Sequence, residues 1–211
     1  RFMTTEKHKL ARFWDKNAES YAKSSIRNEE AYLEKIQKTQ TYFNPDMSLM
    51  EFGCGTGTTA LHHAPHVKQI LATDVSPKML EIAQDKAKDL GIDNVTFHQA
   101  TLDELAATGQ TFDCILGMNI IHLLPDKGQA LAQAYGMLKP GGVFISSTAC
   151  LADSWLVILW PLLILGRLIG KVPLVRIFGM KNLERAIENV GFTIQHSEKL
   201  NGTFIASTKP A

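Results

Sequence analysis

SLMEFGCGTGTTALHH, residues 48–63, decides the fold of this chain. Its apolar start predicts a buried strand, and the residues from Thr58 onward predict a helix. Gly53, Gly55 and Gly57 lie between the two, where they allow a sharp turn and leave out Cβ atoms at the point where a ligand comes close. The helix that follows points its first backbone amides at the same place. This turn is therefore expected to meet a nucleoside-like ligand.

Strand-like and helix-like segments alternate on both sides of this turn. Strands are predicted at 48–52, 69–73, 95–99, 112–118, 143–148, 192–198 and 203–208, and helices within 4–42 and at 58–66, 76–90, 127–138 and 181–190. The alternation predicts an α/β fold with a mostly parallel sheet of seven strands and helices on both faces. Asn201 and Gly202 form a tight-turn signal between the last two strands, which predicts one antiparallel strand near an edge.

The composition indicates one globular domain. The chain has 211 residues, of which 45% are apolar and 20% charged, and a formal net charge of +1. Residues 1–211 are read as a single domain with an N-terminal helical cap at 1–45 and an apolar insert at 153–180. The near-neutral charge argues against nucleic acid as a partner. Three cysteines without paired spacing, and a polar N-terminus, favour a cytoplasmic protein.

Two acidic residues flank the glycine turn. Glu51 precedes Gly53 by two positions, and Asp74 follows the next predicted strand. Ligands of parallel α/β sheets lie beyond the carboxyl ends of the strands, so a carboxylate at position 74 can accept hydrogen bonds from ribose hydroxyls. Thr58 stands where dinucleotide-binding turns carry their third glycine. A nicotinamide-dependent oxidoreductase is therefore disfavoured.

Five segments of the chain resemble the class I S-adenosylmethionine-dependent methyltransferase family, in particular its small-molecule, ubiquinone-biosynthesis-like branch. LMEFGCGTG (49–57) is similar to its first motif and ATDVSPKMLEIAQDKA (72–87) to its second. TFDCILGMNIIHLLPD (111–126) and LKPGGVFISST (138–148) resemble the regions of its fourth and fifth strands. FWDKNAESYAK (13–23) resembles a helix that closes over the cofactor. The resemblance implies a Rossmann-like fold and S-adenosylmethionine as the cofactor.

The resemblance also assigns cofactor contacts. It implies that Asp74 binds the ribose, that Met79 lies near the adenine and that Tyr21 contacts the cofactor from the N-terminal helix. The full set of expected contacts is Tyr21, Glu51, Gly53, Cys54, Gly55, Thr56, Gly57, Asp74, Val75, Met79, Thr101, Leu102 and Met118.

One position departs from the family pattern. Many members carry a carboxylate after the third strand that takes the adenine amino group, whereas this chain has QATLD at 99–103. Asp103 lies later than that carboxylate would. We therefore expect the backbone around Thr101 and Leu102 to hold the adenine.

Residues after the fourth strand are candidates for the acceptor side. His122 is the candidate general base, with packing against the following helix as the alternative. Asn119 could fix a polar group of the acceptor or serve a turn. His62, His63 and His66 are read as surface histidines, and no metal site is predicted, because no carboxylate or cysteine completes a ligand set.

An apolar run, WLVILWPLLIL at 155–165, follows the fifth strand. It is too short to span a bilayer, which takes about 20 apolar residues. Three interpretations stay open. The run could form a buried or dimer-forming helix pair, or a lid that includes Trp155 and covers an apolar acceptor. Alternatively, residues 154–178 could form an interfacial helix that lies at a membrane surface. The last would make the protein peripheral to a membrane.

The sequence thus favours a methyltransferase that transfers a methyl group by direct displacement to a small, lipophilic acceptor, with lipids and prenylated quinone precursors as the first acceptors to test. Alignment and exclusion of water would supply most of the catalysis, because the cofactor is already activated. A non-catalytic cofactor-binding or membrane-associated protein with the same fold is the alternative.

Overall fold

The structure is a computed structural model that describes residues 2–24, 28–153, 172–200 and 202–211. Its strands are β1 (Ser48–Phe52), β2 (Gln69–Asp74), β3 (Val95–Gln99), β4 (Phe112–Met118), β5 (Leu138–Thr148), β6 (Thr193–Lys199) and β7 (Thr203–Thr208). Its helices are α1 (Phe2–Lys23), α2 (Glu29–Gln40), α3 (Thr58–His63), α4 (Pro77–Asp89), α5 (Leu102–Ala106), α6 (Lys127–Met137) and α8 (Met180–Val190). Single 3-10 turns are η1 (Ala64–His66), η2 (Ile121–Leu123) and η3 (Leu151–Asp153).

All seven strands form one sheet in the order β3-β2-β1-β4-β5-β7-β6. β7 runs antiparallel to both of its neighbours, β5 and β6, and the other pairs are parallel. The order changes direction between β1 and β4, which is where ligands of such sheets bind. The predicted fold class, a mostly parallel seven-stranded sheet with one antiparallel strand, is confirmed.

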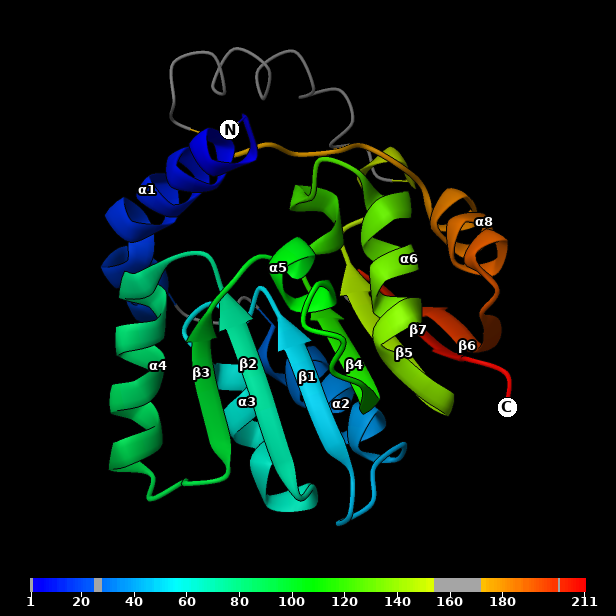
Figure 1. Ribbon diagram of the computed structural model, residues 1–211, viewed down its shortest axis with the longest axis horizontal. Coiled ribbons are helices and arrows are strands. Elements are labelled where there is room, and N and C mark those ends of the chain that lie inside the picture. The colour runs from blue at the N-terminus through cyan, green and yellow to red at the C-terminus, as the bar shows by residue number, and fades with distance from the viewer. Residues whose placement is uncertain (1, 25–27, 154–171, 201) are drawn as a thin grey trace.

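Helices cover both faces of the sheet. In Figure 1, α6 and α8 lie in front of it and α2 and α3 behind it. The front face encloses a core that includes Phe144, Leu183 and Ile187, and the back face one that includes Leu49, Ala60 and Leu80. Alternate residues of each central strand enter opposite cores, as strands covered on both sides require.

Two elements differ from the prediction. α5 was not expected; it begins at a capping box in which Thr101 and Glu104 bond to each other's backbone amides. β5 begins at Leu138 and not at Val143, and its register against β4 shifts between Phe112 and Cys114. The Pro-Gly-Gly turn thus lies within the strand as an irregularity and does not precede it.

The segment 172–179 is not helical, so the interpretation of 154–178 as an interfacial helix, one of the three left open, is wrong for residues 172–178. Pro173 has no amide hydrogen to give to a helix. Instead the segment runs extended, with Arg176 N donating to His122 O at 2.7 Å and Ala152 N donating to Phe178 O at 3.3 Å. The remainder of the insert, 154–171 with Trp155, lies outside the described residues. None of the described helices has the length and apolarity to cross a membrane.

Candidate functional site

The glycine turn has the backbone conformation that only glycine adopts without strain. Gly53, Gly55 and Gly57 have φ values of +65°, +54° and +73°. Gly57 is also a packing point, because a Cβ there would lie 2.8 Å from Ala83 Cβ and 2.8 Å from Phe97 Cε1. The close approach that dinucleotide turns obtain from a later glycine is thus made here by Gly57. The turn lies beyond β1, and three of its amides are bonded within the protein: Cys54 N to Thr73 O at 2.9 Å, Gly55 N to Asp74 Oδ2 at 2.9 Å and Gly57 N to Cys54 O at 3.0 Å.

Asp74 is anchored beside the glycine turn. Its carboxylate accepts from Gly55 N and from Ser76 N, both at 2.9 Å, and only 9% of the residue is exposed. Burial raises the pKa of Asp74, while the bonds from Ser76 and Gly55 lower it. A carboxylate has about four lone-pair sites. The anchored Asp74 therefore keeps acceptor capacity for hydroxyl groups of a ligand.

The carboxyl group of Glu51 is buried and lacks part of its hydrogen bonding. Only 2% of the residue is exposed, and its Oε2 has no hydrogen-bond partner among the described residues. Burial, followed by the nearby charge of Asp74, raises the pKa of Glu51 to about 8. A buried carboxyl oxygen without a donor costs free energy that a cationic ligand would recover. Glu51 thus fits an ammonium group beside the glycine turn.

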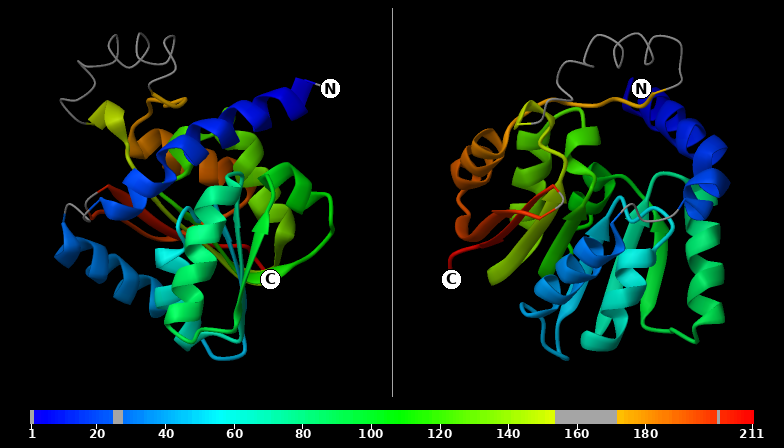
Figure 2. Two further views of the ribbon diagram at one scale, coloured as in Figure 1. Left: turned by 90° about the vertical axis from the view of Figure 1, so that its left-hand side faces the viewer. Right: turned by 180° about the vertical axis from the view of Figure 1, so that it is seen from behind.

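Helix α1 lies beyond the carboxyl ends of the strands (Figures 1 and 2) and contacts residues that follow three of them. Lys7 Nζ pairs with both oxygens of Glu104 at 2.6 Å, after β3. Asp15 Oδ1 accepts from the Ser76 hydroxyl at 2.6 Å, after β2. Tyr21 Cε1 lies 3.7 Å from the point that a Gly55 Cβ would take, after β1. The helix is therefore placed to cover a ligand along this edge.

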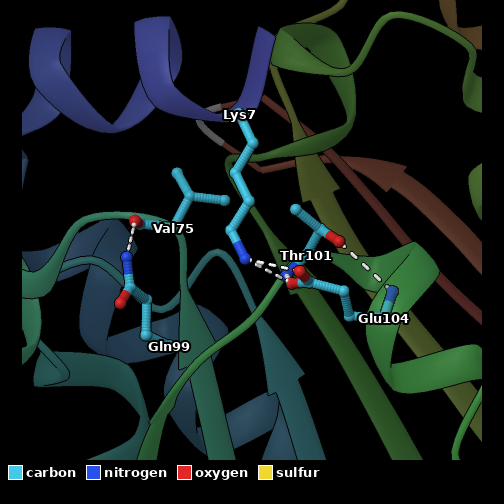
Figure 3. Close-up of polar contacts among 5 residues, drawn as sticks. All are labelled: Lys7, Val75, Gln99, Thr101 and Glu104. Atoms are coloured by element: carbon cyan, nitrogen blue, oxygen red, sulfur yellow. Dashed lines mark hydrogen bonds and ion pairs between the residues drawn. The ribbon is translucent and has the colours of Figure 1, made fainter. Parts of the chain in front are cut away.

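The predicted adenine end is drawn in Figure 3. The Thr101 amide donates to Glu104 Oε2 at 2.8 Å and is thus already bonded, whereas the Thr101 hydroxyl accepts from Glu104 N at 3.2 Å and keeps its own proton to donate. Contacts of adenine with the backbone around Thr101 and Leu102 stay a prediction. Gln99 lies beside Asp74 in the β2–β3 register and donates its Nε2 to Val75 O at 3.0 Å. That bond leaves the Gln99 carbonyl oxygen as an acceptor. Sequence reasoning missed Gln99, although its place at the end of a strand was a signal.

The other predicted cofactor residues are placed as follows. Met79 is buried, with 2% exposed, and Cys54 is buried with a thiol pKa that burial raises. Thr56 accepts from Lys86 Nζ at 3.0 Å. Leu102 is the first residue of α5 and packs against the front core. These residues lie around the glycine turn or support it. Their contacts with a ligand stay predictions, as do those of Val75 and Met118.

The acceptor candidates lie beyond β4. Asn119 has φ +54°, and its N–H donates to Ser147 O at 2.6 Å. A left-handed asparagine at a strand end is a strained position of the kind found at binding sites. His122 Nδ1 is buried without a partner among the described residues, and burial lowers the pKa of this imidazole. Asn119 lines a small cavity with Met118 and Ser147, whereas His122 is not among its lining residues.

The three histidines of α3 and η1 do not all lie at the surface. His62 and His66 are exposed, but His63 is fully buried against Phe43, with ring centroids 5.0 Å apart. Burial lowers the pKa of His63 to about 3, so this histidine is neutral. The surface interpretation was wrong for His63. Across the described ranges no three metal-ligating side chains gather.

Comparison with known proteins agrees with this geometry. A family described as a methyltransferase domain matches residues 49–142. The chain is 30% identical over 132 residues to the uncharacterized methyltransferase YcgJ of Bacillus subtilis, covering 63% of this chain and 52% of that protein. It is 30% identical over 102 residues to a ubiquinone biosynthesis O-methyltransferase of Azorhizobium caulinodans, covering 48% and 40%. The chain thus spans about half the length, or less, of these curated relatives.

A solved structure with the same fold contains a ligand. The N-methyltransferase NodS of Bradyrhizobium japonicum, in complex with S-adenosylhomocysteine, superposes with a TM-score of 0.71. The match covers 97% of this chain and 98% of NodS at 17% identity. At this identity the likeness concerns the fold.

Proposed function

We propose that this chain, whose residues 49–142 match a family described as a methyltransferase domain, is a class I S-adenosylmethionine-dependent methyltransferase that transfers a methyl group to a small, lipophilic acceptor. The observation that carries the proposal is the set of residues around the glycine turn beyond β1 and β2. It combines three left-handed glycines, an anchored Asp74 and a buried Glu51 oxygen that has no donor among the described residues. A nucleoside with an ammonium group satisfies these features together.

The residues present fit three parts of S-adenosylmethionine. Glu51 would take its ammonium group and Asp74 its ribose hydroxyls, beside a turn whose three glycines carry no Cβ atoms. The Gln99 carbonyl oxygen would accept from the adenine amino group in place of the missing carboxylate. Tyr21 would cover this assembly from α1.

The cofactor supplies a methyl group that is already activated as a sulfonium. The protein's own residues therefore need to align the acceptor and exclude water, and such alignment can be worth about 7–11 kcal/mol. Helix α1 is held in place by its bonds to Glu104 and Ser76, and it would exclude water from the carboxyl edge of the sheet. His122 can take a proton from an acceptor that arrives protonated, since its Nδ1 has no partner among the described side chains.

The lipophilic character of the acceptor is proposed from sequence and relatives. The run at 155–165 contains no charge, and Ile177 and Phe178 continue the apolar character of the insert. A relative is named for ubiquinone biosynthesis. Contact of 154–178 with a lipid surface, or with a second copy of the chain, is part of the same proposal. Sedimentation with liposomes and light scattering test those two contacts separately.

Transfer of labelled methyl groups tests the proposal. The protein would be incubated with methyl-labelled S-adenosylmethionine and pairs of phenols that differ only in a hydrocarbon chain. We expect label in the chain-bearing phenol, and less of it in the matched phenol without the chain. Equal labelling of the pair would contradict the lipophilic acceptor. Failure to bind S-adenosylmethionine would contradict the methyltransferase itself.

A further inference from the structure

A small cavity lies on the back face of the sheet, where β4 and β5 end. Its lining includes Tyr32, Lys35, Thr59, Met118, Asn119 and Ser147. Its volume is about 20 Å³, which is room for one water-sized atom. Elements far apart in the sequence form it, namely α2, α3 and two strand ends.

Lys35 brings a positive charge into this cavity. The residue is 7% exposed, and its Nζ donates to Ser147 Oγ at 3.2 Å. Within the described part of the chain, no carboxylate forms an ion pair with it. An ammonium has three donors and here meets one neutral hydroxyl. Burying a charge without a counter-ion is costly, and burial accordingly lowers the pKa of Lys35.

The neighbouring lysine on α2 shows the contrast. Lys38 forms an ion pair with Glu198 of β6, at a half-buried position. Both lysines thus reach from the same helix toward the sheet, but only Lys38 finds an anion among the described residues. Lys35 is left facing the cavity.

Other groups around the cavity are also donors. The Tyr32 hydroxyl lies 3.3 Å from Thr59 Oγ1, and burial raises the pKa of Tyr32 to about 12, so its proton stays on. Asn119 is held in its left-handed conformation by the bond from its N–H to Ser147 O. Its exposed side chain carries two amide donors. A cation and neutral donors together form the environment of an anion.

We infer that Lys35 is the acceptor-binding residue and that the cavity takes a single negatively charged oxygen of the methyl acceptor, such as an ionised phenol or enol oxygen. The inference rests on the proposed function. The small cavity fits an oxygen at the end of a ligand, whose remainder would lie outside it. Lys35 would donate to that oxygen and supply its counter-charge.

The position of the cavity suits an acceptor. β4 is the neighbour of β1, and Glu51 is paired with Leu116, two residues before Met118. Burial and then the charge of Glu51 raise the pKa of Tyr32, so Glu51 is close enough to act on a residue that lines the cavity. An acceptor oxygen that binds as an anion has already lost its proton, and this route needs no general base.

Absorbance of para-nitrophenol tests the inference, because its anion and its neutral form have different spectra. The phenol would be titrated with protein below its own pKa, with and without S-adenosylhomocysteine. We expect the wild type to shift the ionisation constant of the bound phenol by about tenfold or more toward the anion. Lys35→Met should abolish the shift and Lys35→Arg should retain it. Lys38→Met, on the same helix, is the matched control and should also retain it.

Calorimetry with S-adenosylhomocysteine checks that each variant is folded, and we expect Lys35→Met to bind it as the wild type does. A wild type that binds S-adenosylhomocysteine but does not ionise the phenol overturns the inference and leaves the proposed function standing. An equal shift in wild type and Lys35→Met overturns it as well, since water or chloride would then fill the cavity. Ionisation through Lys35 without S-adenosylhomocysteine binding supports the anion site and contradicts the proposed function.

Discussion

The two halves of the carboxyl edge are built in different ways. Beyond β1 and β2, the carboxylate of Asp74 bonds to Gly55 and Ser76, which are 19 and two residues away in the sequence. Beyond β4 and β5, Lys35 bonds to Ser147, which is 112 residues away. The centre of the nucleoside half is therefore encoded more locally than the acceptor half, although α1 and Gln99 join it from farther away.

The strongest way to break the nucleoside half is Gly57→Ala. The left-handed conformation costs an alanine roughly 1–2 kcal/mol. Its Cβ would also meet Ala83 and Phe97 at 2.8 Å, and such overpacking costs typically about 1–3 kcal/mol. We expect urea unfolding to show a loss of about 2–5 kcal/mol.

Gly55→Ala is the matched control for this change. Gly55 is also left-handed, but its Cβ would meet only Tyr21, at an ordinary 3.7 Å. Its loss of stability should be clearly smaller. Equal losses for the two variants would show that packing at Gly57 is not what sets its identity.

Glu51 sharpens the comparison through the pH dependence of stability. Its folded pKa, about 8, lies above its ordinary value of 4.5, so between these values the folded state binds more protons than the unfolded state. Stability of the ligand-free protein should therefore fall as the pH rises through this window. The loss should be on the order of 5 kcal/mol, and Glu51→Gln should remove it. Urea unfolding across this pH range measures the free energy of unfolding of the wild type and of Glu51→Gln.

Glu104 gives a control of opposite sign. The ion pair with Lys7 lowers the pKa of Glu104, so its contribution is present above its ordinary pKa and is lost as the pH falls. Glu104→Gln should therefore flatten the acid side of the stability profile only. A wild-type profile that does not fall between the two pKa values of Glu51 would contradict the burial of an unpaired carboxyl.

The difference between the halves explains what the sequence could predict. The positions of β1, β3 and β4 follow from short apolar runs, and Asp74 follows from its place after a strand. Lys35 and Gln99 carry no such local mark, because their roles depend on Ser147 and Val75 across the sheet edge. A charged residue on α2 reads as a solvated one until its surroundings are known.

The two wrong interpretations have the same cause. The apolar alternation in 172–178 suggested a helix, but Pro173 and a bond from Arg176 N to His122 O hold it extended. His63 lies between two exposed histidines, and only its packing against Phe43 shows that it is buried. Both outcomes depend on partners that are remote in the sequence.

Asp74→Ala tests the ligand side of the nucleoside half. The change leaves two backbone amides without an acceptor and removes the proposed ribose partner. S-adenosylhomocysteine binding should weaken by about 1–3 kcal/mol, measured by calorimetry.

The control for this change is Asp113→Ala. Asp113 also accepts from a backbone amide, Ser48 N at 2.8 Å, but it lies where β4 begins, at the opposite edge. Its loss should leave the affinity unchanged. An Asp74→Ala protein with wild-type affinity would refute the ribose role.

The smallest expected effect concerns α1. Lys7→Ala removes the exposed pair with Glu104 at the adenine end. Exposed pairs are worth about 0–1 kcal/mol, so S-adenosylhomocysteine affinity should fall slightly, and less so at high salt. Lys9→Ala, at an exposed position of the same helix, is the control. An equal effect of both changes would show that net charge, and not the pair, matters.

The most direct test of the account is calorimetry of S-adenosylhomocysteine binding near neutral pH in two buffers of different ionisation enthalpy. If the ligand's ammonium group meets the protonated, buried Glu51, binding must lower the pKa of Glu51 and release its proton. We predict binding with release of close to one proton per ligand in the wild type and no proton release in Glu51→Gln. Absence of binding, or binding without proton release in the wild type, would contradict the account.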